Sequence, residues 1–93
     1  MPNINDILPN TGKIISISGK KVAVFNNNGT PKGFSPVCPH VGCDIEWHAT
    51  EKIWFCPCHG SRFDTEGALL RGPAMNGLEP IGLIVENDEI KIY

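Results

Sequence analysis

Two short motifs rich in cysteine and histidine lie in the middle of this chain and constrain its fold more than any other feature. The first reads Cys-Pro-His-Val-Gly-Cys over residues 38–43, and the second reads Cys-Pro-Cys-His-Gly-Ser over residues 56–61. Thiolate and imidazole together suit zinc, copper or iron-sulfur chemistry. A chain of 93 residues has room for only one modest hydrophobic core. The motifs therefore predict a small lobe organised around a bound group, within a single domain.

Outside the motifs, apolar and polar residues alternate with the two-residue period of antiparallel strands. Strands are expected at residues 13–17, 21–25, 33–35, 44–46, 53–55, 62–64, 68–70, 81–85 and 89–93. Gly19 and the Asn28-Gly29 pair favour tight hairpin turns between the first three strands. Helical spacing never persists for ten residues, so at most one helical turn fits around residues 4–8.

This pattern predicts an all-β, antiparallel fold for one domain spanning residues 1–93. We expect the two ends, about residues 1–36 and 78–93, to form a β base. The cysteine- and histidine-rich lobe and a proline-containing loop are expected at about residues 37–77. This segment holds all four Cys, all three His and both Trp of the chain.

Charge and hydropathy argue against several classes of partner. A net charge of -2 and a pI near 5.8 provide no positive field for phosphate, so neither nucleic acid nor an anionic membrane is an expected partner. No run of eighteen apolar residues is present, and residues 1–6 lack the basic start and apolar core of a signal peptide. We therefore expect a cytoplasmic protein without a membrane anchor.

The spacing of the motifs leaves several uses of these side chains open. A bare disulfide framework would pair the four Cys in one of three ways, but it has no use for the neighbouring histidines. A structural zinc site needs four tetrahedral ligands, and six candidates are present. A plant-type ferredoxin cluster requires Cys-x4-Cys-x2-Cys, and the twelve residues between Cys43 and Cys56 break that pattern.

A fourth use takes one Cys and one His from each motif. The spacing is then Cys-x-His and Cys-x-x-His with fifteen residues between, as in 2Fe-2S clusters where two histidines replace two cysteines on one iron. On these motifs, together with Gly42, Gly60 and Ser61, the sequence resembles the Rieske family. The resemblance implies a Rieske (ISP-like) fold, in which a small cluster-binding lobe is inserted into an antiparallel β base. Gly72-Pro73-Ala74 resembles the proline loop of that family.

The resemblance assigns the cluster ligands residue by residue. It implies that Cys38 and Cys56 bind one iron and that His40 and His59 bind the other. His48 lies outside both motifs, and we expect it to be an ordinary free histidine. Five aromatic side chains are expected to pack in the core or lobe: Phe25, Phe34, Trp47, Trp54 and Phe55.

Further roles follow from the same resemblance. In the disulfide-bearing branch of the family, the positions of Cys43 and Cys58 are joined to each other. Ser61 matches a hydroxyl that hydrogen-bonds a bridging sulfide, and Pro73 belongs to the loop beside the cluster. Phe63 stands where quinol-oxidising members have a Tyr, so one hydroxyl donor is missing. We therefore expect a lower reduction potential than in those members.

The implied function is electron transfer through a Rieske 2Fe-2S cluster, with no substrate chemistry of the domain's own. A redox partner protein or a flavin domain is expected to dock at the tip that carries His40 and His59. The motifs are similar to those of the C-terminal Rieske domain of bacterial FAD-dependent oxidoreductases, which implies a module of a larger oxidoreductase. The alternatives are the head domain of a cytochrome bc-type quinol oxidase and a zinc-stabilised interaction module.

Overall fold

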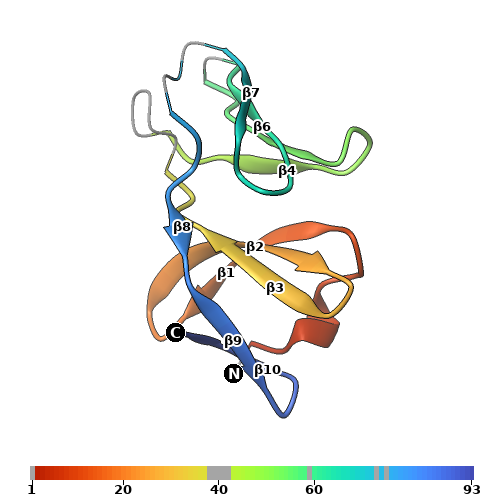
Figure 1. Ribbon diagram of the computed structural model, residues 1–93. Coiled ribbons are helices and arrows are strands. Elements are labelled where there is room, and N and C mark those ends of the chain that lie inside the picture. Colours follow the sequence, from red (N-terminus) through yellow and green to blue (C-terminus); the bar gives the residue numbers. More distant parts are fainter. Residues whose placement is uncertain (1, 38–42, 59, 73, 75) are drawn as a thin grey trace.

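The regular structure of this protein consists almost entirely of short antiparallel strands (Figure 1). The computed structural model describes residues 2–37, 43–58, 60–72, 74 and 76–93. The elements of these residues are η1 (Ile4–Asp6), β1 (Gly12–Ile17), β2 (Lys20–Asn27), β3 (Thr30–Phe34), β4 (Glu46–His48), β5 (Ile53–Phe55), β6 (Arg62–Phe63), β7 (Leu69–Arg71), β8 (Pro80–Ile81), β9 (Leu83–Glu86) and β10 (Glu89–Ile92). The predicted all-β antiparallel fold is confirmed, and η1 is the single helical turn expected near the N-terminus.

The base contains a sheet in the order β1-β2-β3-β8 and a separate hairpin, β9-β10 (Figure 1). The predicted meander of β1, β2 and β3 is confirmed, but β3 is longer than expected and begins at Thr30. Asn28 and Gly29 adopt φ of 51° and 95°. A two-residue turn with positive φ at both positions has a twist that matches the twist of the flanking strands. The pairing of β2 with β3 therefore begins immediately beside the turn, with Asn27 opposite Thr30.

Strand β2 is buried on both of its faces. Val22 and Val24 point into a cluster with Ile4 and Ile90, on the side of η1 and the β9-β10 hairpin. Ala23 and Phe25, which alternate with them, belong to a second cluster that includes residues of the lobe. Strand β2 therefore separates the two buried clusters and contributes side chains to both, one in the base and one that extends into the lobe.

The strand expected at residues 81–85 is interrupted, which corrects the sequence-based prediction. Ile81 in β8 pairs with Gly33 of β3, whereas β9 pairs only with β10. At Gly33 a Cβ atom would lie 2.7 Å from the Leu83 side chain. Leu83 fills the space that Gly33 leaves empty, and the chain changes its pairing partner at Gly82, between the two strands.

The lobe is a second sheet in the order β4-β5-β6-β7 (Figure 1). The strand at residues 53–55 is confirmed, but the one expected at 44–46 begins two residues later, at Glu46. Asp44 instead forms an isolated bridge with Val37, which closes the first motif rather than extending the sheet. No helix among the described residues is long and apolar enough to span a membrane.

Candidate metal centre

The antiparallel pairing of β4 and β5 brings the two motifs to the same end of the lobe. Glu46 lies opposite Phe55, so the start of β4, just after the first motif, is next to the end of β5, just before the second. His48 pairs with Ile53 beside the turn at the other end of this hairpin. The pairing therefore juxtaposes the motifs and places His48 away from them.

Each motif begins and ends at backbone contacts that close it into a loop. In the first, Val37 bridges Asp44, and the Ile45 N–H donates to the Pro36 carbonyl at 2.7 Å. In the second, the Cys56 N–H donates to the Ser61 carbonyl at 2.8 Å. These bonds close each loop separately, at the end of the sheet where the β4-β5 pairing brings both loops.

A disulfide between Cys43 and Cys58 joins these two loops, with their Cα atoms 6.5 Å apart. The predicted pairing is therefore confirmed. Cys56 is the free cysteine among the described residues and is fully buried. The sulfur atoms of Cys43, Cys56 and Cys58 lie within 4.8 Å of one another. The disulfide thus lies directly beside the one described thiol that remains available to bind a metal.

The surroundings of Cys56 fit a soft metal or an iron-sulfur group. Its backbone is held by the Ser61 carbonyl and by the Gly60 N–H, which donates to the Cys56 carbonyl at 2.9 Å. Its side chain belongs to a buried cluster with Ile45, Trp54 and Phe63. A thiolate in a rigid loop against an apolar wall provides a soft ligand with restricted access of water.

The other predicted ligands, Cys38, His40 and His59, and the loop residue Pro73 lie outside the described residues, so their roles remain predictions. Cys38 directly follows Val37, and His59 directly follows Cys58.

Two further residues singled out from the sequence are both fully buried in the lobe. Phe63 lies in β6 opposite Trp54 and is part of the lobe core. The Ser61 hydroxyl accepts a hydrogen bond from the Ala74 N–H at 3.2 Å. Ala74 thus contributes to the surroundings of the site, in the segment expected to be the proline loop, although its hydrogen bond to Ser61 was not predicted. A backbone donor leaves no side-chain signal, so only the Gly-Pro-Ala motif pointed to this segment.

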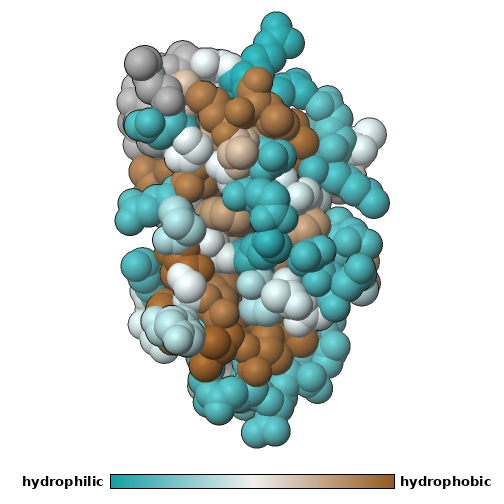
Figure 2. Space-filling model, viewed as in Figure 1, coloured by the Kyte–Doolittle hydropathy of each residue, from teal (hydrophilic) through white to brown (hydrophobic). Residues whose placement is uncertain are grey.

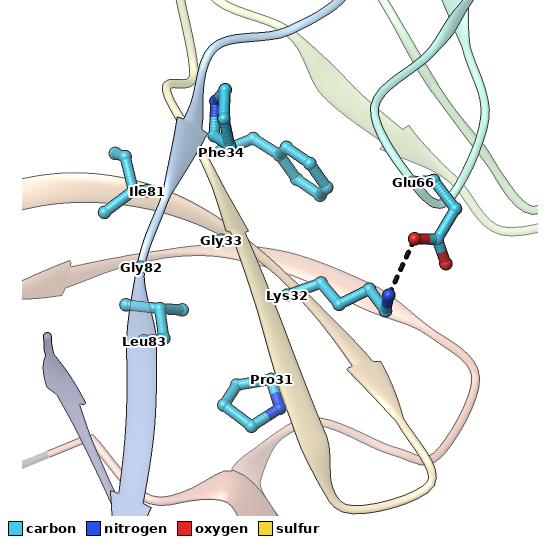
Figure 3. Close-up of a pocket in the computed structure, with 9 residues that line it drawn as sticks. Pro31, Lys32, Gly33, Phe34, Glu66, Ile81, Gly82 and Leu83 are labelled. Atoms are coloured by element: carbon cyan, nitrogen blue, oxygen red, sulfur yellow. Dashed lines mark hydrogen bonds and ion pairs between the residues drawn. The ribbon is translucent and has the colours of Figure 1, made fainter.

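Two other features of the fold are separate from this centre. The Nδ1 atom of His48 accepts the Glu51 N–H at 3.2 Å, and its ring packs edge-on against Phe55. A hollow of about 300 Å³ lies between β3 and the β8-β9 segment, with Lys32 and Glu66 at its rim (Figure 3). No thiol or imidazole lines this hollow among the described residues. Neither feature offers a metal site.

Comparison with known proteins agrees with this arrangement. The model of the Rieske [2Fe-2S] domain family matches residues 2–86. The putative Rieske 2Fe-2S iron-sulfur protein YhfW of Bacillus subtilis (strain 168) is 40% identical over 79 residues, which cover 84% of this chain and 16% of that protein. The cytochrome b6-f complex iron-sulfur subunit of Synechococcus sp. (strain JA-3-3Ab) is 41% identical over 77 residues, which cover 81% of this chain and 45% of that protein.

Among solved structures, the plasma membrane Rieske protein PetC3 from Synechocystis PCC 6803 superimposes with a TM-score of 0.76. It is 28% identical, and the match covers 88% of this chain and 85% of that one. By contrast, this chain spans less than half the length of each of the two curated relatives above.

Proposed function

Because this chain belongs to the Rieske [2Fe-2S] domain family, we propose that its two motifs jointly hold one Rieske-type cluster and pass single electrons through it. Cys38 and Cys56 would bind one iron, and His40 and His59 the other. When bound, such a cluster takes up and releases one electron, at a higher potential than all-cysteine clusters because two neutral imidazoles replace two thiolates.

The observation that carries this proposal is the Cys43–Cys58 disulfide. It removes one thiol from each motif, so that one Cys and one His remain in each: Cys38 with His40, and Cys56 with His59. A Rieske cluster requires this set of two thiolates and two imidazoles. A zinc site would also accept four such ligands, so metal analysis is needed to separate the two.

The chain's own residues would serve the cluster in distinct ways. The Cys43–Cys58 disulfide holds the two loops together. The apolar cluster around Cys56, which includes Trp54 and Phe63, excludes water from one side of the centre. The buried Ser61 hydroxyl supplies a hydrogen-bond donor, which stabilises negative charge on a cluster sulfur.

We propose that a redox partner protein or a flavin domain docks at the end of the lobe that carries the two motifs. Apolar side chains are exposed nearby: Val37, which immediately precedes the first motif, is 45% exposed, and Leu70 on β7 is 56% exposed. Figure 2 shows apolar surface on the lobe, the upper half of this view. Exposed apolar groups beside a redox centre favour close approach of a partner, which shortens the path of the electron.

The wider context is a separate part of the proposal. We propose a cytoplasmic module of a larger oxidoreductase that depends on FAD. The Bacillus relative, of which this chain covers 16%, supports the idea that such a domain can be part of a much longer protein. The similarity to a cytochrome b6-f iron-sulfur subunit favours the alternative, a head domain of a cytochrome bc-type quinol oxidase.

The function is tested by analysing the purified protein for iron, acid-labile sulfide and zinc. We expect two irons and two sulfides per chain, and an EPR signal on reduction whose average g lies below that of all-cysteine clusters. Stoichiometric zinc without sulfide, in both aerobic and anaerobic preparations, would contradict the proposal.

The wider context needs a separate test. An antibody against this domain should detect a cytoplasmic polypeptide that is much larger than 10.1 kDa and carries FAD.

A further inference from the structure

Ser61 is held from two directions at once. Its carbonyl accepts the Cys56 N–H at 2.8 Å, and its hydroxyl accepts the Ala74 N–H at 3.2 Å. Ser61 is fully buried, and Ala74 is 4% exposed and shares a buried cluster with Cys56. One residue therefore connects the loop of a proposed iron ligand to a chain segment thirteen residues further along.

Gly72 makes this arrangement possible. A Cβ atom at Gly72 would lie 2.4 Å from the Ser61 Cα and 2.9 Å from its Oγ, distances that no real side chain tolerates. Gly72 also has φ of +114°, in the region that only glycine adopts readily. A glycine at this position lets the backbone approach Ser61 closely enough for the Ala74 N–H to reach the hydroxyl.

The bond from Ala74 determines how the Ser61 hydroxyl can act. A hydroxyl has one O–H donor and two acceptor lone pairs. Because Ala74 donates to the oxygen, the hydroxyl proton must point elsewhere. No hydrogen bond among the described residues uses that proton. A buried donor without an acceptor is costly, so the arrangement favours an acceptor supplied by the bound group.

We propose that Gly72 and Ala74 are positioning residues that hold the Ser61 hydroxyl as a donor to the cluster and thereby set the reduction potential. The inference rests on the proposed function, because it requires a bound cluster. Gly72 provides the close approach, and the Ala74 N–H orients the hydroxyl. Loss of either contact frees the hydroxyl to rotate, so its stabilisation of the reduced state is weakened.

The test compares the potentials of Ser61→Ala, Gly72→Ala and the double variant by protein-film voltammetry at one pH. We expect each single variant to lower the potential, by about 59 mV for every tenfold loss in the relative stability of the reduced state. In the double variant the hydroxyl is absent, so any fall beyond that of Ser61→Ala measures the contact of the added Cβ with the backbone of residue 61. Gly29→Ala is the control, since Gly29 also has positive φ, 95°, but no atom lies within 4 Å of its added Cβ.

A second variant, Ala74→Pro, removes the N–H donor without adding bulk at Gly72. Ala74→Pro should lower the potential, as Gly72→Ala does. It should cause no further change when it is combined with Ser61→Ala. Hydrogen-deuterium exchange gives a readout that does not depend on electron transfer. The peptide that carries the Ala74 amide should exchange faster in Ser61→Ala than in the wild type.

The outcomes separate the two proposals. Potentials of Gly72→Ala and Ala74→Pro equal to the wild type would overturn the positioning role while the cluster remains established. A shift of Ala74→Pro that adds in full to that of Ser61→Ala would also overturn it, because the Ala74 N–H contacts residue 61 through the hydroxyl. An equal shift in Gly29→Ala would overturn it as well, because general strain would then explain the effect. A wild-type protein without iron and sulfide would overturn the proposed function itself.

Discussion

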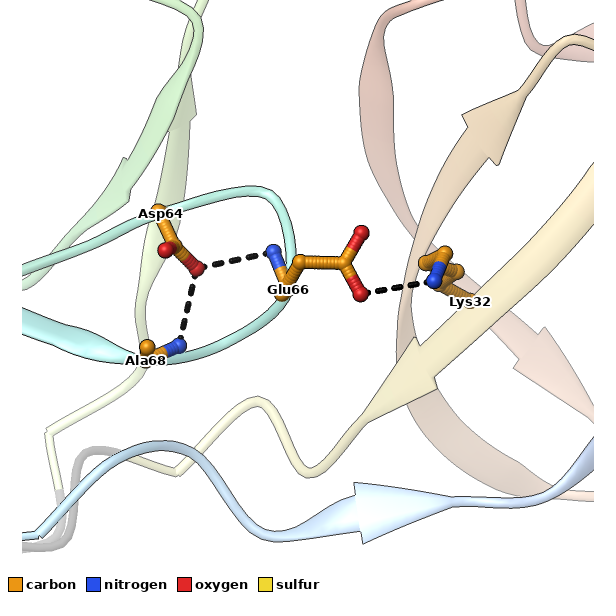
Figure 4. Close-up of polar contacts among 4 residues, drawn as sticks. All are labelled: Lys32, Asp64, Glu66 and Ala68. Carbon is orange, nitrogen blue, oxygen red and sulfur yellow. Dashed lines mark hydrogen bonds and ion pairs between the residues drawn. The ribbon is translucent and has the colours of Figure 1, made fainter.

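Lys32 on β3 and Glu66 in the turn between β6 and β7 form an ion pair across the boundary between base and lobe, with Nζ 2.6 Å from Oε2 (Figure 4). Asp64 holds that turn, since its carboxylate accepts the N–H groups of Glu66 and Ala68 at 2.8 and 2.9 Å. Directly beside the ion pair, a Cβ at Gly67 would lie 2.6 Å from the Phe34 ring. The boundary is thus held by both a charge contact and a tight apolar contact.

The contact between Gly67 and Phe34 should contribute more to the stability of the protein than the Lys32–Glu66 ion pair. Exposed ion pairs contribute about 0–1 kcal/mol, and Glu66 has a side chain 59% exposed, so Glu66→Gln should lower the midpoint of thermal unfolding only slightly. Gly67→Ala forces a methyl group into the Phe34 ring and should cost about 1–3 kcal/mol. At about 4–8 °C per kcal/mol, calorimetry of the cluster-loaded protein resolves the difference.

Gly19→Ala is the matched control for this comparison. Gly19 and Gly67 have φ of 81° and 80°, but no atom lies within 4 Å of a Cβ at Gly19. The difference between the two glycine variants therefore measures the contact with Phe34 alone. Equal losses in both would mean that backbone strain, and not packing, explains the effect.

Replacing both Cys43 and Cys58 by Ser should retain iron and sulfide but destabilise the domain. A cross-link that spans 15 residues stabilises a protein by about 3 kcal/mol, chiefly by restricting the unfolded chain. The loss is measured by thermal unfolding of the cluster-loaded variant against the wild type. Iron content reduced as far as in Cys56→Ala would contradict the assignment of this pair as structural rather than ligating.

Single replacements of the proposed ligands by Ala should abolish or severely reduce cluster assembly, because the iron concerned then keeps only one protein ligand besides the two bridging sulfides and is poorly held. The variants are Cys38→Ala, His40→Ala, Cys56→Ala and His59→Ala, assayed for iron and sulfide per chain. His48→Ala is the control, since His48 lies at the opposite end of the β4-β5 hairpin from the motifs. A colourless His48→Ala beside a fully loaded His40→Ala would refute the ligand assignment.

Phe63→Tyr tests whether a hydroxyl at this position reaches a cluster sulfur. If it does, a hydrogen bond of about 1–2 kcal/mol to the reduced cluster raises the potential by about 40–90 mV. Phe63 is fully buried, so a hydroxyl without an acceptor would instead cost about 1–3 kcal/mol of stability. Voltammetry and thermal unfolding on one preparation decide between these results. A destabilised variant with an unchanged potential would remove the basis for the low potential expected from Phe63.

Features that depend on neighbouring residues were predictable from the sequence. Asn28-Gly29 specifies its turn through a local preference for positive φ, and the meander follows from the alternation on either side. The strand at Ile53–Phe55 was also located correctly. The two motifs identified the kind of site, because the donor set of thiolates and imidazoles is a property of residue type. The Cys43–Cys58 pairing, by contrast, came from the family resemblance and needed the structure for its confirmation.

Contacts between distant segments were decided only by the tertiary structure. Nothing local to Gly82 indicates that the strand changes partner there, since that depends on how Leu83 fits against Gly33. Likewise, the contacts of Gly72 and Ala74 with Ser61 exist because the lobe brings two chain segments together. A sequence specifies turns and ligand types through short-range preferences. Close approach and hydrogen bonding across the chain depend on which surfaces meet, and that is set by the packing of the whole domain.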